Sequence, residues 1–323
     1  MEGVDSYKNT SNIPIAFVIY KRPDVTRRVF AAIAAARPRR LYVIADGPRD
    51  ESEAARCAET RAIIEGVNWP CEVFTDYAET NLGLKRRNSS GMDWVFAHEE
   101  RAIILEDDNL SDPTFFRYCA DLLDHYRDDE RIMQIAGTNP LRGAYRPQAS
   151  YFFTGYMHTW GWATWRRAWQ HFDVTMSQWA DPQVREHVLS QFSNLRERDF
   201  WFHQWSQCYE GKIDSWSFGW SFACRARDGL SVMPRHNLIS NIGFGLEATH
   251  TLVRNRVAAM PTQPMTFPLR HPTTVMRDVE ADRLLSRVAL LRPPLYRRAV
   301  NRLRRYWRRA RRMVRSSGSI SQR

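Results

Sequence analysis

The first 140 residues alternate short apolar runs with longer stretches that have one apolar face. The apolar runs are residues 14–20, 41–45, 72–75, 102–105 and 132–136. The helical stretches are residues 24–36, 51–66, 89–99 and 114–126. Asp24 is the expected N-cap of the first of these helices. Strands that are apolar along their length are typical of parallel sheets covered on both faces. The pattern therefore predicts an α/β fold, with a mostly parallel sheet between two layers of helices.

Polar residues follow three of the predicted strands. They are residues 20–22, which include Arg22, then Asp46 with Gly47, and the acidic triplet Glu106-Asp107-Asp108. The carboxyl ends of parallel strands meet at one edge of a sheet, and ligands of such folds bind there. We therefore expect these residues to line one site.

The acidic triplet is the strongest chemical signal in the chain. Adjacent carboxylates repel one another, so they need a cation close by. Mg²⁺ and Mn²⁺ bind such oxygen ligands, and they commonly bridge one or two carboxylates to substrate phosphates. The alternative is a solvated acidic turn before the helix that begins near Pro113. The position after a buried strand favours the metal site.

A basic loop precedes the third predicted helix. Its Asn81-Leu82-Gly83 segment allows close backbone approach, and Lys85, Arg86 and Arg87 follow. Cations beside a helix N-terminus suit a diphosphate, although an ordinary basic turn has the same composition. The chain has no G-x-x-x-x-G-K-[ST] motif and no G-x-G-x-x-G after its first strand. This disfavours a P-loop enzyme and a dinucleotide-binding domain.

Residues 160–220 contain nine of the twelve tryptophans. Flat indole rings stack on the C–H faces of sugars, and neighbouring polar groups can bind hydroxyls. We expect most of these tryptophans in the core. Trp160 and Trp162, beside His158, are the candidates for binding an acceptor sugar.

Positive charge is concentrated at the C-terminus. Thirteen of the 47 Lys and Arg residues lie in residues 287–323, where there is no Asp or Glu. The rest of the chain is nearly neutral, with 34 basic and 36 acidic residues. A uniformly basic nucleic-acid binder is therefore disfavoured.

A proline-punctuated linker over residues 261–292 is expected to lead into this basic segment. Apolar residues recur at i, i+3 and i+4 from 296 to 314, so residues 293–315 are predicted to form an amphipathic helix with an arginine face. Such a helix suits an anionic membrane surface, with RNA binding or packing on a partner helix as alternatives. Residues 316–323 are expected to be disordered.

No export signal is visible in the sequence. The first twelve residues are polar, no run suits a membrane span, and the five cysteines form no C-x-x-C pair. These features favour a reducing compartment. We therefore expect a cytoplasmic protein that its C-terminal helix holds at the inner face of the membrane.

Several segments together resemble a known family. They are residues 15–23, 42–49, 81–83, 103–108 with Phe115-Phe116, 160–169, 237–245 and 248–251. In their residues and in their order along the chain, these segments resemble GT-A-type glycosyltransferases. They resemble more closely the bacterial nucleotide-diphospho-sugar transferases that are distantly similar to the eukaryotic α-mannoside β-1,2-N-acetylglucosaminyltransferase. The resemblance covers about residues 13–251. It implies one GT-A domain, with a nucleotide-sugar half over 13–140 and an acceptor half over 141–260.

The resemblance implies roles for individual residues. Asp108 would hold the metal, with Asp107 or Glu106 in support. His250 falls where such enzymes often place a further metal or phosphate ligand, although a lone histidine is commonly structural. The other donor-site candidates are Arg22 and Asp46 for the nucleoside, Lys85 and Arg87 for the diphosphate, and Asn81 in the loop before them.

The chain departs from the family where a catalytic base is expected. The family commonly has Trp-Asp-Tyr-Gln-Trp where residues 216–220 read Trp-Ser-Phe-Gly-Trp. The hydroxyl of Ser217 is no base without help, so Asp214 is the expected substitute, with Asp199 and Glu247 as alternatives. A turn role is the competing interpretation of Asp214.

The sequence as a whole predicts a metal-dependent glycosyltransferase. It would move a hexosyl or N-acetylhexosaminyl group from a nucleotide diphosphate, UDP by resemblance, to a glycan or lipid-linked acceptor. Mn²⁺ or Mg²⁺ would be the cofactor. The alternative is an inactive scaffold of the same fold that binds glycans or membranes, which the Ser217 departure motivates. No specific nucleic acid is expected as a partner.

Overall fold

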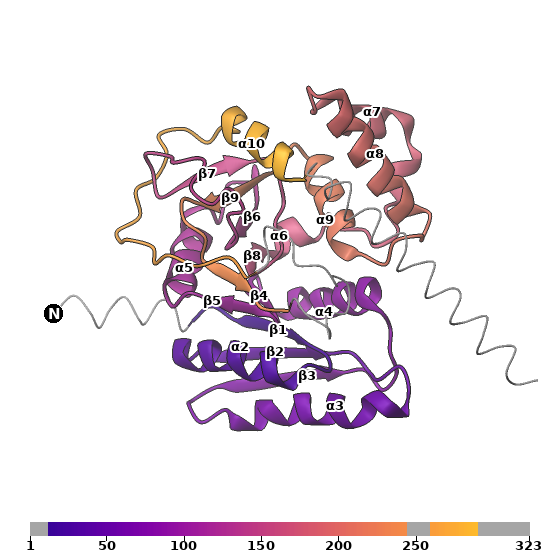
Figure 1. Ribbon diagram of the computed structural model, residues 1–323, viewed down its shortest axis with the longest axis vertical. Coiled ribbons are helices and arrows are strands. Elements are labelled where there is room, and N and C mark those ends of the chain that lie inside the picture. Colours follow the sequence, from indigo (N-terminus) through magenta and orange to yellow (C-terminus); the bar gives the residue numbers. More distant parts are fainter. Residues whose placement is uncertain (1–11, 244–258, 290–323) are drawn as a thin grey trace, which may run out of the picture. The chain divides into compact units, whose positions relative to one another are not determined.

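The computed structural model describes residues 12–243 and 259–289 (Figure 1). Its longest strands are β1 (Ile15–Ile19), β2 (Arg40–Ala45), β3 (Glu72–Tyr77), β4 (Arg101–Glu106), β6 (Ile132–Ala136), β7 (Tyr151–Thr154), β8 (Trp162–Trp165) and β9 (Leu230–Pro234). The predictions for His250, for Glu247 and for the segments 293–315 and 316–323 fall outside the described residues.

These strands form one eight-stranded sheet in the order β3-β2-β1-β4-β8-β6-β9-β7. Six of them run in one direction, and β7 and β8 run in the opposite direction. The mostly parallel sheet confirms the predicted fold class. The five strands predicted from the sequence begin and end within two residues of the predicted positions.

Side chains of the central strands alternate between two apolar layers. In β1, Ile15, Phe17 and Ile19 face the first layer, and Ala16 and Val18 face the second. The helices α2 (Pro23–Ala36) and α5 (Thr114–His125) bury their apolar residues in the first layer. The helices α4 (Leu84–His98), α6 (Arg166–Trp169) and α9 (Trp216–Arg225) bury theirs in the second. Helices therefore cover both faces of the sheet, as predicted.

The starts of two helices differ from the prediction. α2 begins at Pro23, so Asp24 lies in the first turn rather than at the cap. α4 begins at Leu84 instead of residue 89, because Gly83 adopts a φ of +82° and the carboxylate of Asp214, from a distant part of the chain, accepts hydrogen bonds from the first amides of the helix. The predicted helix over 51–66 is α3 (Glu51–Ala62) followed by a 3₁₀ turn.

A separate helical cluster consists of α7 (Pro182–Ser190), α8 (Leu195–Tyr209) and the outer side of α9. Its core contains Trp179 and Trp205. Trp216 and Trp220, on the other side of α9, pack with Trp162 in the second apolar layer. Most of the tryptophans are therefore core residues, as predicted.

The described part of the expected linker packs on the body of the protein. Met265 and Leu269 are buried in the first apolar layer. In α10 (Val279–Ala289), Ala281 is buried, and Asp282 accepts hydrogen bonds from Thr154 and Gly155 at the end of β7. The prolines exclude regular secondary structure, which is why the sequence predicted a linker. They do not prevent the apolar side chains between them from packing in the core. The linker prediction is therefore wrong over these residues.

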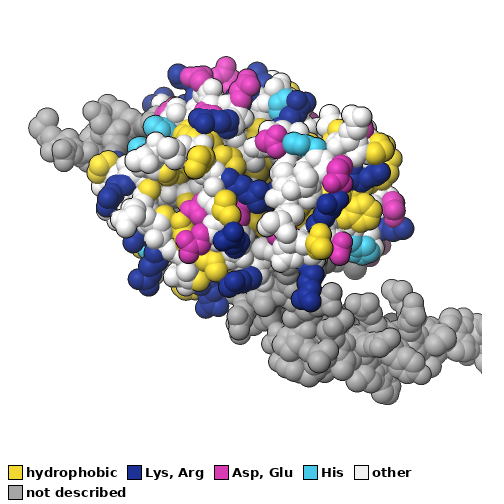
Figure 2. Space-filling model, turned by 90° about the horizontal axis from the view of Figure 1, so that it is seen from above, with side chains coloured by type: hydrophobic (Ala, Val, Ile, Leu, Met, Phe, Trp, Pro, Cys, Tyr) yellow, Lys and Arg dark blue, Asp and Glu magenta, His cyan; other side chains and the backbone are white. Residues whose placement is uncertain are grey.

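The surface of the described residues carries charges of both signs, as expected for a body that is nearly neutral. Basic and acidic side chains are interspersed on the face shown in Figure 2. All five cysteines are free. None of the helices in the described ranges combines the length and the apolar character needed to cross a bilayer.

Candidate active site

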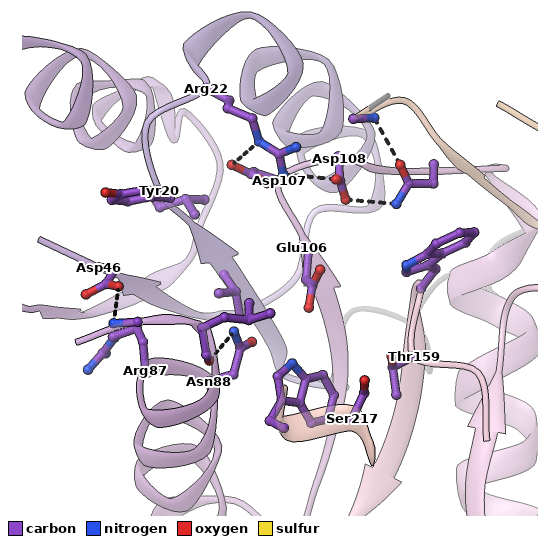
Figure 3. Close-up of a pocket in the computed structure, with 18 of the residues that line it drawn as sticks. Tyr20, Arg22, Asp46, Arg87, Asn88, Glu106, Asp107, Asp108, Thr159 and Ser217 are labelled. Carbon is purple, nitrogen blue, oxygen red and sulfur yellow. Dashed lines mark hydrogen bonds and ion pairs between the residues drawn. The ribbon is translucent and has the colours of Figure 1, made fainter. Parts of the chain in front are cut away.

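A cavity of about 220 Å³ opens at the carboxyl ends of β1, β2 and β4 (Figure 3). Arg22, Asp46 and the acidic triplet, which follow these strands in the sequence, all line it. The opposite wall comes from α9 and from β10 (Ile239–Asn241), which pairs with β5 (Asn109–Ser111). The expectation that these residues meet at one edge of the sheet is confirmed.

Arg22 bridges the two aspartates of the triplet. Its guanidinium donates hydrogen bonds to Asp107 and, at 2.9 Å, to Oδ2 of Asp108. The three side chains are 15%, 5% and 12% exposed, so water screens these charges little. The protein itself therefore supplies one of the positive charges that the carboxylates need.

Asp108 is held on its other side by two amides and a close backbone. Asn109 donates to Oδ1 of Asp108 at 2.7 Å, and Asn241 donates to the same oxygen at 3.3 Å. A Cβ on Gly243 would lie 2.1 Å from Oδ2 of Asp108. A larger residue would have to displace Asp108 and Arg22, so the segment after β10 closes one side of the acidic pair.

Glu106 points away from Arg22 and Asp108, into the cavity that Ser217 and Thr159 also line (Figure 3). Burial, together with the charges of Asp108 and Asp107, raises the pKa of Glu106 above its ordinary value. Its orientation contradicts the expectation that it supports a metal on Asp108.

Asp46 organises the loop that precedes α4. Its two carboxylate oxygens accept four hydrogen bonds, from the amides of Gly47, Leu82 and Gly83 and from the side chain of Asn81, over 2.8–3.1 Å. A carboxylate has about four acceptor positions, so little capacity is left for a nucleoside. Asp46 and Asn81 line the cavity, but their hydrogen bonds chiefly hold the loop before α4 in place.

Of the three basic residues expected near a diphosphate, only Arg87 lines the cavity. It is 4% exposed and forms an ion pair with Asp76, and its Nε has no hydrogen-bond partner among the described atoms. Lys85 instead reaches the carbonyl of Cys208 at 3.4 Å. The prediction for Lys85 therefore does not agree with its position, whereas Arg87 stays a candidate.

Asp214 caps α4 rather than lining the cavity. Its carboxylate accepts hydrogen bonds from the amides of Leu84 at 3.1 Å and of Lys85 at 2.9 Å. The helix N-terminus expected to bind a phosphate is thus already occupied by a carboxylate. Asp214 and Asp199 are both exposed and outside the lining, which contradicts a role as base, while Ser217 does line the cavity.

The three acceptor candidates lie in different surroundings. Trp160 lines the cavity. Trp162 is wrong as an acceptor contact, because it is fully buried among Trp169, Trp216 and Trp220. His158 is half-buried outside the lining, and burial lowers its pKa to about 4, so its ring is neutral at physiological pH.

Four further polar lining residues were not singled out from the sequence: Arg49, Asn88, Thr159 and Asn241. Arg49 and Asn241 lie inside segments that carry the family resemblance, so the signal was available at segment level. Asn88 is on the second turn of α4, which the late predicted start of that helix concealed. Thr159 precedes Trp160 and carries no motif of its own.

The described residues suit a divalent metal bound through a single carboxylate. In residues 12–243 and 259–289, no three His, Cys, Asp or Glu side chains come close enough to hold a metal ion. Mg²⁺, however, commonly uses one or two carboxylates together with substrate phosphates. Asp107 is engaged by the cationic Arg22 through both oxygens, whereas Asp108 meets Arg22 through Oδ2 alone and accepts only neutral amides at Oδ1. Asp108 is therefore the carboxylate that fits such an ion.

Comparisons with known proteins add little to this geometry. No family model matches the sequence, and no curated protein is detectably similar to it. One similar solved structure is that of a UDP-glucose pyrophosphorylase complexed with UDP-glucose, with 11% sequence identity and a TM-score of 0.33. The match covers 69% of this chain and 90% of that chain. Similarity of this degree shows nothing about activity.

Proposed function

We propose that this protein is a glycosyltransferase that moves a sugar from a nucleotide diphosphate, with UDP favoured, to a saccharide or lipid-linked acceptor. The observation that carries the proposal is the composition of the cavity. An acidic pair, three arginines and an indole ring line one site at the carboxyl edge of a mostly parallel sheet. These groups match a metal-bound diphosphate and a sugar ring. The sequence resemblance to GT-A enzymes supports the same activity.

We assign the donor to the side of the cavity formed by β1, β2 and α4. A nucleoside diphosphate carries several negative charges, and Arg22, Arg49 and Arg87 are the basic residues that line the cavity in the described ranges. The planar guanidinium matches phosphate oxygens through paired hydrogen bonds. Asp46 and Asn81 hold the adjoining loop in place for this donor.

We assign a divalent metal, Mn²⁺ or Mg²⁺, to Asp108. When bound, it would act as a Lewis acid that neutralises charge on the departing diphosphate. Asp107 keeps Arg22 beside that position through its ion pair. A metal on Asp108 and the guanidinium of Arg22 would together offset the negative charge of the leaving group.

We assign the acceptor to the side where Thr159, Trp160 and Ser217 lie. The indole of Trp160 offers a stacking face for a sugar, and the two hydroxyls can orient sugar hydroxyls. Glu106 is the carboxyl group that reaches this side of the cavity. We therefore assign to Glu106, instead of Asp214, the role of accepting the proton from the acceptor hydroxyl, which it would do as the carboxylate that a divalent cation on Asp108 favours.

A catalytically inactive scaffold of the same fold is the second candidate. The observation that favours it is Ser217, which lines the cavity where the resembling family has an aspartate. Such a protein would still bind UDP or glycans in this cavity but would not turn them over.

Substitution of Asp108 tests the proposal. With UDP-sugars and Mn²⁺, Asp108→Asn should release UDP at least about tenfold more slowly than the wild type, because the carboxylate that would hold the metal is lost. Asp128→Asn, which alters a carboxylate that is 84% exposed, is the matched control and should leave the rate unchanged.

The two candidate functions give different results in this assay. Equal UDP release by Asp108→Asn and the wild type would refute the metal assignment. Binding of UDP without any release from a panel of UDP-sugars would favour the scaffold. Neither release nor a thermal shift on adding UDP with Mn²⁺ would refute the donor assignment.

A further inference from the structure

A second cavity, of about 470 Å³, lies beyond the carboxyl ends of β6 and β9. Arg142, Arg146, Arg235 and His236 line it, and we call it the distal basic cavity. No Asp or Glu is among the described residues of its lining. Its charged groups are therefore of one sign, whereas the candidate active site mixes acids and arginines.

Two of these arginines lack the partners that surface arginines usually have. Within the described ranges, neither Arg146 nor Arg235 forms an ion pair, and the buried Nε of Arg235 makes no hydrogen bond. Both arginines also act on His236. Burial is the largest cause that lowers the pKa of this histidine, and the charges of Arg235 and Arg146 lower it further. With no carboxylate paired to them in the described ranges, the guanidinium groups of Arg146 and Arg235 are available to pair with an anion in the cavity.

Two asparagines tie the walls of the distal basic cavity together. Asn139, which is buried, donates hydrogen bonds to the carbonyls of Pro234 at 2.8 Å and Arg235 at 3.1 Å. The side chain of Asn237 accepts from the amide of Asn139 at 3.0 Å and donates to the carbonyl of Pro261 at 3.2 Å. Three chain segments are thus joined around Arg235, so the site is held in one shape before a ligand arrives.

The segment that contains β10 joins the two cavities. Asn237 lines the distal basic cavity, while Asn241 and Gly243 line the candidate active site. The four steps from Asn237 to Asn241 span at most about 14 Å in an extended chain. Because β6 and β9 run in the same direction as β4, both cavities open on the same edge of the sheet. A ligand of a few sugar units is long enough to reach from one to the other.

We propose that the distal basic cavity binds a phosphate group of the acceptor while the sugar end of the acceptor lies in the candidate active site. This inference rests on the proposed glycosyltransferase function. Guanidinium groups match phosphate oxygens in pairs, and a phosphate of about two negative charges balances Arg146 and Arg235. The acceptor is then a phosphorylated saccharide, whether a soluble sugar phosphate or the phosphate-linked headgroup of a lipid.

Calorimetric titration of the full-length protein with inorganic pyrophosphate tests the site. Because the candidate active site also suits pyrophosphate, titrations are run with and without excess UDP. The double variant Arg146→Gln with Arg235→Gln should bind at least about tenfold more weakly than the wild type. Arg227→Gln alters an exposed arginine of another cavity and should bind as the wild type does. Unchanged affinity in the double variant would overturn the proposal.

Two further variants keep the test informative if the double variant does not fold. Arg146 is exposed, so Arg146→Gln alone repeats the test if the double variant fails to fold, and it should still weaken pyrophosphate binding. Arg235→Lys keeps the charge but loses the planar fork, so it should weaken binding less than Arg235→Gln does. Equal binding by Arg146→Gln and the wild type, in proteins with equal unfolding temperatures, would contradict the proposal.

UDP affinity separates this inference from the proposed function, because neither Arg146 nor Arg235 lines the candidate active site. If the double variant loses pyrophosphate but the wild type does not bind UDP, the anion site stands and the transferase function falls. Competitors then identify the source of the phosphate. Displacement of pyrophosphate by a hexose 1-phosphate indicates a soluble acceptor, and displacement by vesicles containing polyprenyl phosphate indicates a lipid-linked one. Displacement by neither would overturn the assignment of this cavity to the acceptor.

Discussion

Charged side chains in the cavity wall are largely engaged with one another. Arg22 is bound to Asp107 and Asp108, and Asp46 is bound to the loop that contains Asn81. The sequence predicts which residues reach the edge of the sheet, since the ends of strands determine that. It does not reveal which of their atoms are already bonded, because the partners come from other elements.

His158 gives the stability of the protein a pH dependence. Burial lowers its pKa to about 4 from an ordinary value of 6.5. The folded state therefore resists protonation, and this contribution is complete above pH 6.5 and is lost as the pH falls toward 4. Between pH 7.5 and pH 5 the wild type should lose about 2 kcal/mol more free energy of unfolding than His158→Gln. Urea denaturation at the two pH values measures the difference.

The exposed His203 provides the control for this measurement. His203→Gln should follow the pH dependence of the wild type. If His158→Gln loses as much stability as the wild type over the same interval, then burial does not perturb the His158 ring.

At the scale of elements, the boundaries of α4 show where prediction from sequence stops. The strands were found because apolar runs are local signals, and α5 was predicted to within one residue of its end. The first turn of α4 depends on Gly83 and on Asp214, which is 130 residues from Leu84 in sequence. A cap supplied from so far away leaves no local pattern.

Substitution of Asp214 distinguishes a cap from a catalytic base. Asp214→Asn keeps one acceptor oxygen at the helix N-terminus, so the free energy of unfolding should fall by less than about 1 kcal/mol. The kcat for sugar transfer should stay within about threefold of the wild type, whereas loss of a general base lowers it by about a hundredfold or more. Asp214→Ala removes the cap and should cost about 1 kcal/mol in urea denaturation. A large loss of kcat in Asp214→Asn at unchanged stability would restore Asp214 as the base.

At the scale of the whole molecule, the change in charge composition falls close to Ala289, where the described residues end. Composition alone placed the change near residue 287, because every acidic residue precedes it. The same reasoning misjudged residues 261–289, since their prolines hide a few apolar side chains that pack in the core. Net charge is a sum over the chain, whereas packing depends on single side chains.

Removal of residues 290–323 tests the role proposed for the C-terminal segment. The truncated protein should keep its unfolding temperature, because α10 ends at Ala289 and its buried contacts remain. It should no longer float with vesicles that contain phosphatidylglycerol, whereas the full-length protein should, and neither should float with phosphatidylcholine alone. Equal flotation of both proteins would contradict a membrane role for this segment. Salt-dependent RNA binding that disappears on truncation would favour the nucleic-acid alternative.

The position of α9 has an evolutionary consequence. Phe222 belongs to the core of the outer helical cluster, Trp216 and Trp220 belong to the layer beneath the sheet, and Ser217 lines the cavity. Residues 182–209 contribute no side chain to the lining of the candidate active site, and they meet the rest of the fold largely across α9, with a few direct contacts such as that of Cys208 with Lys85. Their sequence can therefore diverge with little change at the strand ends, whereas a substitution within α9 alters the outer cluster, the apolar layer and the cavity together.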